Sequence, residues 1–183
     1  MTPPADRGSF SRVMRAGSLA LGYPDAGWRQ DLPLLHATAD AVAGPAQAGL
    51  RAFLDAVAAR SPGEFQQAYV ETFDLRRRCC PYLTYYSCGD TRKRGMALLQ
   101  FTAAYLTAGF EQAGGELPDH LAVLCEFTAA APWLTVVDAI RAVLPDPAPR
   151  DLQRALDLAR SGPPAEEVGL EPFAPPEYMG GRR

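Results

Sequence analysis

Apolar residues recur in steps of three and four along most of this chain, and proline or glycine separates one such stretch from the next. Phe10, Val13 and Gly17 illustrate the spacing, which ends where Tyr23 and Pro24 break it. This period places apolar side chains on one face of a helix. No segment alternates apolar and polar residues between turn signals, as a strand would. The sequence therefore predicts an all-α protein, a single irregular bundle of about six to eight helices.

The clearest helix start is at Ser61. Ser61 can cap a helix, Pro62 suits the first helical position, and Glu64 completes a capping box. We expect this helix to run from Pro62 to about Leu75, and a loop to occupy residues 81–87 after the next proline. The other expected helices are 10–21, 31–42, 50–57, one that begins at Asp90 or Thr91 and ends at Gly114, 117–131, 133–144 and 150–160.

The helix that begins at Asp90 or Thr91 carries a long apolar pattern. Steps of three and four predict which of its residues face the core, and neighbouring apolar residues widen that stripe. The predicted buried stripe is Met96, Leu99, Ala103, Leu106 and Phe110, widened by Leu98, Phe101 and Tyr105.

Composition indicates one globular domain with a tail. The chain has 183 residues, of which 48% are hydrophobic and 21% charged, and this is enough to bury a sizeable core. Residues 163–183 differ, because five prolines, three glycines and four acidic residues leave them few apolar side chains. We expect an all-helical domain over residues 1–162 and an extended or mobile tail over residues 163–183.

Charge and hydropathy disfavour two classes of protein. A net charge of −3 argues against binding nucleic acid with the whole surface, since that affinity rests largely on Lys and Arg. Arg12 and Arg15 precede an apolar run that stops at Gly22, too short for a signal peptide. No stretch approaches the ~18 apolar residues of a membrane span. We expect a soluble, cytoplasmic protein that does not insert into a membrane.

Two basic clusters lie between Tyr69 and Leu99. The predicted helix over 62–75 places Arg76–Arg78 at its end, where cations complement the negative end of the helix dipole. Arg92–Arg94 instead occupy the first turn of the next helix, where the dipole disfavours positive charge. Such a cluster indicates binding of a partner or an anion, or else a surface paired internally with Glu71 and Asp74.

Cysteine and histidine allow several interpretations. Cys79, Cys80 and Cys88 could form a metal or redox site, but adjacent cysteines lack the usual zinc-ligand spacing, and ordinary thiols are the simplest account. His120 could be an acid or base, although without a nucleophile motif a structural or recognition role is favoured. The chain has no Gly-rich phosphate loop, nucleophile elbow or two-histidine metalloprotease helix. We therefore expect no enzyme, no metal and no bound cofactor.

Aromatic residues lie beside the two basic clusters. Tyr82, Tyr85 and Tyr86 could stack on nucleic-acid bases or contact an apolar peptide face. Tyr69 and Phe73 are spaced i and i+4 on the predicted helix, and a simple core role suits them. A nucleic-acid-binding or regulatory helical module and a cysteine-based metal or redox-sensing protein both remain as alternatives.

Four short runs, in this order, resemble a known family. They are LALGYPD at 19–25 with Trp28, YVETFDL at 69–75, GDTRKRG at 89–95 and LPDHL at 117–121. Together they extend from about Leu19 to Phe127. In this combination the chain resembles the nitrate reductase molybdenum cofactor assembly chaperones of the NarJ or delta-subunit type, which are similar to the TorD and DmsD redox-enzyme maturation chaperones.

The resemblance implies an all-helical chaperone without catalytic activity. Such proteins bind the leader-like N-terminal segment of the apo catalytic (alpha) subunit of respiratory nitrate reductase. They keep that subunit competent for insertion of its molybdenum cofactor, and they delay its docking at the membrane. The machinery that delivers the cofactor is a second partner that the resemblance implies.

By position, the resemblance also implies which residues line or brace the client groove. A basic amphipathic client requires an apolar trough and carboxylates, for which Glu71, Asp74, Asp119 and Glu126 are the acidic candidates. Arg92 and Arg94 could pair either with a carboxylate of the client or with those acidic residues of this chain. The complete expected set is Tyr69, Glu71, Phe73, Asp74, Gly89, Asp90, Arg92, Arg94, Gly95, Asp119, His120 and Glu126.

Overall fold

The computed structural model describes residues 4–89, 91–113 and 115–143. These residues form eight α-helices, two short 3₁₀ helices and no strand, which confirms the all-α prediction. The α-helices are α1 (Arg7–Leu21), α2 (Leu32–Ala41), α3 (Pro45–Ala58), α4 (Pro62–Phe73), α5 (Leu83–Cys88), α6 (Arg92–Thr107), α7 (Leu121–Ala130) and α8 (Trp133–Val143), and the 3₁₀ helices are η1 (Trp28–Asp31) and η2 (Arg77–Cys79). The predicted helix 150–160 and the predicted tail 163–183 lie outside the described residues.

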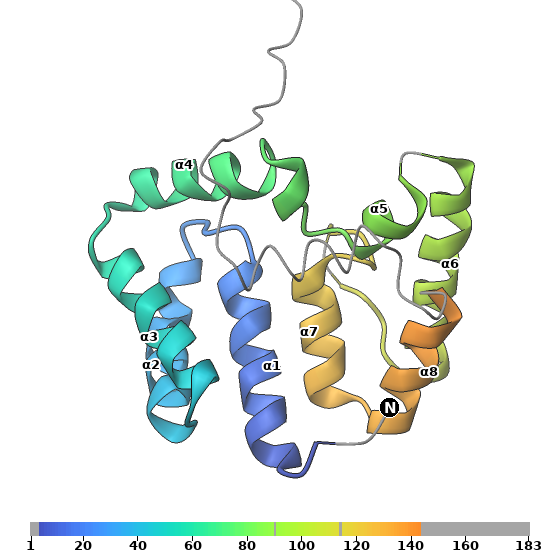
Figure 1. The fold of residues 1–183 in the computed structure, drawn as a ribbon, viewed down its shortest axis with the longest axis horizontal. Coiled ribbons are helices and arrows are strands. Elements are labelled where there is room, and N and C mark those ends of the chain that lie inside the picture. Colours follow the sequence, from blue (N-terminus) through green and yellow to red (C-terminus); the bar gives the residue numbers. More distant parts are fainter. Residues whose placement is uncertain (1–3, 90, 114, 144–183) are drawn as a thin grey trace, which may run out of the picture.

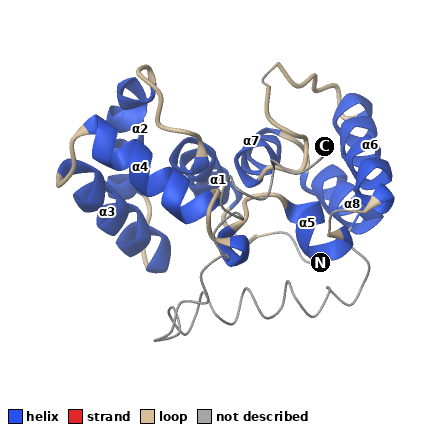
Figure 2. Ribbon diagram, turned by 90° about the horizontal axis from the view of Figure 1, so that it is seen from above, coloured by secondary structure: helices blue, strands red, loops and turns tan. Residues whose placement is uncertain are grey.

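The helices form two groups that meet along α1 and α7. Figure 1 shows these two helices side by side at the centre, with α2 and α3 on one side, α6 and α8 on the other, and α4 across the helix ends; Figure 2 gives the same order from above. Each group has its own core. The core of α1, α2, α3 and η1 is Ala16, Trp28, Leu35, Ala39, Leu54 and Val57. The core of α5–α8 is Leu83, Ala97, Phe101, Tyr105, Leu124, Phe127, Ala131 and Val136.

Close packing joins α1 to α7. A Cβ atom on Gly17 would lie 3.5 Å from Cys125 Sγ, an ordinary van der Waals distance, so the two helices are in direct contact at this point. Arg15 pairs with Glu126 across the same seam, although an exposed ion pair of this kind contributes only about 0–1 kcal/mol. Most of the stability of the seam must therefore come from packing.

The start of α4 agrees with the sequence prediction. Ser61 accepts from the Glu64 backbone N–H, and the Glu64 carboxylate accepts from the Ser61 backbone N–H, which completes the capping box. The helix ends at Phe73, two residues before the expected end. It is tied to the last residue of α1 by the Tyr69 hydroxyl, which donates to the carbonyl of Leu21 at 3.0 Å.

The segment after α4 differs from the prediction in two respects. Arg77 and Arg78 lie in η2, beyond the end of α4, so they do not form the last helical turn. The predicted loop 81–87 contains α5 instead. Backbone bonds from Leu83 N to Asp119 O (3.0 Å) and from Leu121 N to Pro81 O (2.8 Å) fix the start of this stretch, and these contacts are distant in sequence. A local pattern could not reveal them.

The predicted buried stripe of α6 is largely wrong. Met96, Leu99 and Leu106 are exposed, whereas Phe101 and Tyr105 are buried with Ala97. The helix is apolar on two faces, and the face that carries the aromatic rings is the one that packs on α7 and α8. It also ends at Thr107, before Gly109 at φ 80°, and not at Gly114. No helix in the described part of the chain is long and apolar enough to cross a membrane.

Candidate functional site

Asp119 is the centre of a buried polar junction between α5, α6 and the turn before α7. Its side chain is 0% exposed. Its Oδ2 accepts from Thr84 N at 3.0 Å and from Thr84 Oγ1 at 2.5 Å, and Arg94 Nε donates to the same Thr84 hydroxyl oxygen at 3.3 Å. Through Oδ2 the carboxylate holds α5 in place, and its burial suits bracing of the groove better than direct contact with a client's basic residue.

His120 completes this junction. The side chain is 2% exposed, and its Nδ1 accepts from Ala122 N at 3.1 Å, which caps the start of α7. Burial lowers the pKa of His120, against the opposing influence of the Glu116 and Asp119 carboxylates. The ring of Tyr82 lies edge-on to the imidazole at 5.1 Å, and the Arg94 guanidinium lies 5.5 Å from the centre of the same tyrosine ring. His120 and Arg94 thus brace the local structure.

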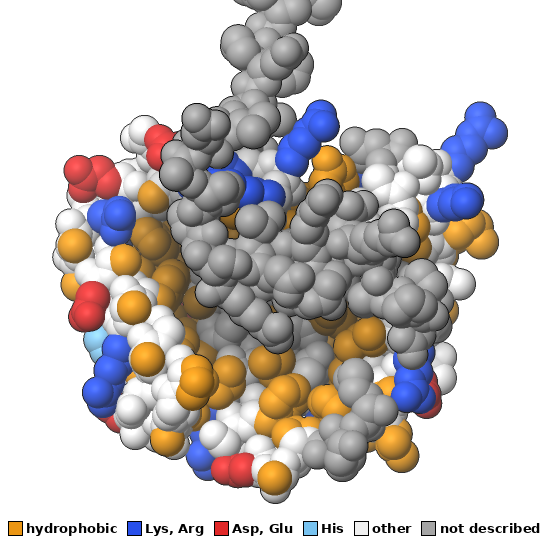
Figure 3. All heavy atoms as spheres, in the orientation of Figure 1, with side chains coloured by type: hydrophobic (Ala, Val, Ile, Leu, Met, Phe, Trp, Pro, Cys, Tyr) orange, Lys and Arg blue, Asp and Glu red, His pale blue; other side chains and the backbone are white. Residues whose placement is uncertain are grey.

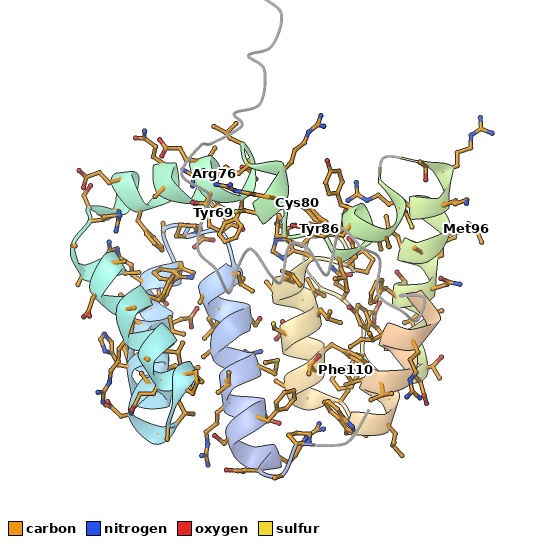
Figure 4. All side chains as sticks on the ribbon, viewed as in Figure 1. Tyr69, Arg76, Cys80, Tyr86, Met96 and Phe110 are labelled. Carbon is orange, nitrogen blue, oxygen red and sulfur yellow. The ribbon has the colours of Figure 1, made fainter. Side chains whose placement is uncertain are left out.

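A second group of aromatic residues joins α4 to the end of α1. The Tyr69 ring lies 5.4 Å from Tyr23 and 4.7 Å from Phe73, measured between ring centres. Tyr23 is exposed, and Tyr69 and Phe73 are half-buried. Figure 4 labels Tyr69 where α4 crosses the end of α1. The core role that spacing suggested for Tyr69 and Phe73 is therefore only partly right, because neither ring is fully buried.

Two carboxylates lie near this group. Burial raises the pKa of Tyr69 to about 12, and the negative charges of Glu116 and Asp74 add to the rise. Burial also raises the pKa of Tyr82 to about 12, and Glu116, which accepts a 3.1 Å hydrogen bond from the Tyr82 hydroxyl, contributes further. Asp74 and Glu116 are themselves exposed.

We call this region the acidic aromatic surface. It brings together residues from α1–α4 and from the start of the second helical group, and it offers rings with two carboxylates to an approaching cation. Its members are Tyr23, Tyr69, Phe73, Asp74, Tyr82 and Glu116. The sequence analysis missed Glu116 as a site residue, and the available signal was its position directly before the LPDHL run.

The remaining predicted site residues lie around this surface or away from it. Glu71 is exposed on α4 and accepts from Gln67 Nε2 at 2.7 Å. Glu126 is engaged with Arg15 at the seam between α1 and α7. Neither residue is shown to belong to the acidic aromatic surface.

The described residues of the GDTRKRG run lie in different local environments. Gly89 ends α5 with φ 56°, a conformation that favours glycine. Arg92 and Gly95 are exposed in the first turn of α6, and Asp90 lies outside the described residues. Among the described residues of this run, Arg94 contacts the buried junction, since its Nε donates to Thr84 Oγ1.

The cysteine segment is held by a tyrosine. The Tyr86 hydroxyl lies 3.0 Å from the carbonyl oxygen of Arg78 and 2.9 Å from that of Cys80. No disulfide joins the four cysteines, all of which lie in the described part of the chain. Among residues 4–89, 91–113 and 115–143, no group of three or more His, Cys, Asp or Glu side chains is placed to hold a metal ion. On the face drawn in Figure 3, basic side chains lie scattered around the rim.

Comparison with known proteins identifies the family. Residues 38–156 match the nitrate reductase delta subunit family. The chain belongs to this family. The matched region begins in α2 and includes Tyr69, Asp74, Tyr82 and Glu116, so most residues of the acidic aromatic surface lie within it.

Individual relatives agree with this assignment. The chain is 36% identical over 115 residues to the probable nitrate reductase molybdenum cofactor assembly chaperone NarJ of Bacillus subtilis. The aligned residues cover 62% of each chain. It is 30% identical over 131 residues to NarJ of Escherichia coli K12, covering 70% of this chain and 56% of that one. It is 37% identical over 120 residues to the nitrate reductase-like protein NarX of Mycobacterium tuberculosis H37Rv, covering 64% of this chain and 18% of that one. The match spans less than two thirds of each relative's length.

Proposed function

We propose that this protein is a non-catalytic chaperone for the catalytic subunit of a nitrate reductase. It binds the N-terminal segment of the apo subunit and supports insertion of the molybdenum cofactor before the enzyme assembles at the membrane. The names of the NarJ relatives support the assembly role. The observation that supports client binding is the acidic aromatic surface, where Asp74 and Glu116 lie near the rings of Tyr69 and Tyr82.

The chemistry of this surface suits a basic amphipathic segment. Tyrosine rings attract Lys or Arg side chains through their negative faces, and Asp74 and Glu116 add charge attraction. Tyr23 and Phe73 offer apolar contacts to the other side of the segment, as in helix-in-groove recognition. Binding in this mode requires no bond to be made or broken in the client, which fits a chaperone.

The other predicted residues take supporting positions in this proposal. Asp119 and His120 act indirectly, because they fix Tyr82 and the turn that carries Glu116. Glu71 adds negative charge on the exposed side of α4, and Gly89 sets the direction of the chain that leads to Arg92 and Gly95.

Peptide titration tests this function. A peptide that copies the first ~15 to 30 residues of the nitrate reductase catalytic subunit should bind with one-to-one stoichiometry in calorimetry. The double variant Asp74→Asn with Glu116→Gln should bind at least about tenfold more weakly, because two charge contacts are lost. Asp55→Asn, an equally conservative change at an exposed carboxylate of α3, is the matched control and should bind as the unmodified protein does.

Two results would contradict the proposal. No heat change with well-folded protein would remove the client interaction itself. Unchanged affinity in the double variant would leave the client interaction in place but exclude the acidic aromatic surface as its site. A gel-shift assay at low salt examines the nucleic-acid alternative, whose affinity should fall steeply as salt is added.

A further inference from the structure

The outer face of α6 carries a stripe of apolar side chains that no described residue covers. Met96, Leu99 and Leu106 are 64%, 63% and 59% exposed, and Ala103 is exposed between them. At about 100° per residue these four positions fall within about 80° of the helix circumference, so they share one face. We call them the α6 stripe. Figure 4 labels Met96 on the side of α6 that points away from the bundle.

The α6 stripe is not required by the fold. The opposite face of the helix already supplies Ala97, Phe101 and Tyr105 to the core. A surface helix of a monomer ordinarily places polar residues on its solvent face, and a contiguous exposed apolar patch marks an interaction site. A partner surface that fits the stripe is also apolar and narrow.

We propose that the α6 stripe binds the same stripe of a second copy of this chain, with the two helices antiparallel. The spacing along the stripe is three, four and three residues, which reads the same in both directions. A two-fold axis that crosses the stripe at the level of residue 101 would therefore set Met96 against Leu106 of the partner subunit. It would also set Leu99 against Ala103 of the partner subunit. Each large side chain near the axis faces a small one, which lets the helices approach closely.

The charges at the two ends of α6 favour this arrangement. Arg92 begins the stripe, four residues before Met96, and exposed Glu111 follows four residues after the last helical residue. Antiparallel pairing brings Arg92 towards the C-terminal end of α6 of the partner subunit, where the helix dipole is negative and the chain continues to Glu111, whereas parallel pairing would bring the two Arg92 side chains together. The dimer thus gives a role to a cation at a helix start, where the dipole disfavours it.

The same charges distinguish this surface from the proposed client site. A basic client segment would be repelled by Arg92 and Lys93 at the head of the α6 stripe, and it is attracted to Asp74 and Glu116. One helix pair is also a small interface, near or below the ~1,200 Å² of the smallest specific complexes. We therefore expect a weak dimer that forms as concentration rises.

Sedimentation analysis of the full-length protein over a wide concentration range tests the dimer. The unmodified protein should pass from monomer to dimer, and Leu99→Glu should raise the dissociation constant by at least about tenfold because a charge enters the interface. Leu34→Glu on α2, another exposed leucine at 47%, is the matched control and should leave the dimer unchanged. A protein that stays monomeric throughout, or a Leu99→Glu variant that dimerises normally, overturns the proposal.

Charge reversal and cross-linking test the antiparallel register. Arg92→Glu and Glu111→Arg should each weaken the dimer, and the variant that carries both changes should recover it. Mixed Met96→Cys and Leu106→Cys chains should form a disulfide-linked dimer under mild oxidation, while Met96→Cys alone should not exceed the background of the unmodified protein with its four native cysteines. Efficient cross-linking of Met96→Cys alone, or protection of the stripe by the client peptide in a protein that remains monomeric, would contradict this geometry.

Discussion

The buried junction around Asp119 and the α6 stripe reverse the usual distribution of polar and apolar residues. Asp119 and His120 are enclosed although they are polar, and Met96 and Leu99 are exposed although they are apolar. Both features lie in the second helical group, whose core is formed by α5–α8. A buried polar group and an exposed apolar patch are the observations that most need a physical reason.

The reasons differ between the two regions. Asp119 is buried with its Oδ2 accepting two bonds from Thr84, and these bonds fix a helix of only six residues, α5. The α6 stripe is exposed because the opposite face of the helix packs better, with Phe101 and Tyr105 inside. Burial in this group is thus decided by bonding and shape at particular positions as well as by hydrophobicity.

The largest effect should come from comparing the two faces of α6. Phe101→Ala should lower the free energy of unfolding by about 4 kcal/mol, because a fully buried ring leaves a cavity. Leu99→Ala, measured in dilute protein, should change it by less than about 0.5 kcal/mol. Urea unfolding followed by circular dichroism measures both values. Equal losses would mean that the two faces of α6 are buried to the same extent.

Removal of the buried carboxylate should have the next largest effect. Asp119→Ala should cost about 3 kcal/mol in urea unfolding, because Thr84 loses its acceptor and Arg94 loses a nearby negative charge. Asp74→Ala is the control from the exposed acidic set and should cost less than about 0.5 kcal/mol. If the Asp119 variant is as stable as the control, the junction is not a structural requirement.

A smaller effect is expected in the first helical group, which follows the ordinary rules. Ser61→Ala should cost about 1 kcal/mol, the usual value for a lost helix cap. Replacing Ser61 by Asn, another good capping residue, should restore most of that loss in the same unfolding assay. A loss in Ser61→Ala that Asn does not restore would point to a role beyond capping.

These regions also show how far the sequence could predict the structure. The start of α4 was predicted correctly, because its capping box involves residues three apart in the chain. The fold class and most helices follow from apolar spacing in the same way. The existence of α5 could not be predicted, since backbone bonds to Asp119 and Leu121 fix it from more than thirty residues away.

The site shows the same division between local and distant information. Spacing located Tyr69 and Phe73 together on α4, and their ring contact is local. Proximity of Glu116 and Tyr82 to Tyr69 depends on how the two helical groups meet, and no pattern in the chain encodes that distance. On α6 the sequence did reveal an apolar stripe, but two apolar faces compete on that helix and spacing does not rank them.

The smallest expected effect is a pH dependence of the buried junction. Burial lowers the pKa of His120 in the folded protein, while the same group in the unfolded chain titrates near its ordinary value of about 6.5. Below that value the unfolded chain binds more protons, so the free energy of unfolding should decrease as pH falls through the window beneath about 6.5. Glu116 and Asp119 oppose this trend because their charges favour the protonated imidazole.

The variant His120→Asn tests this pH dependence. It keeps a capping side chain and lacks the titrating group, so its free energy of unfolding should fall less steeply over the same window. Parallel slopes for the two proteins would show that the imidazole is not held neutral by burial.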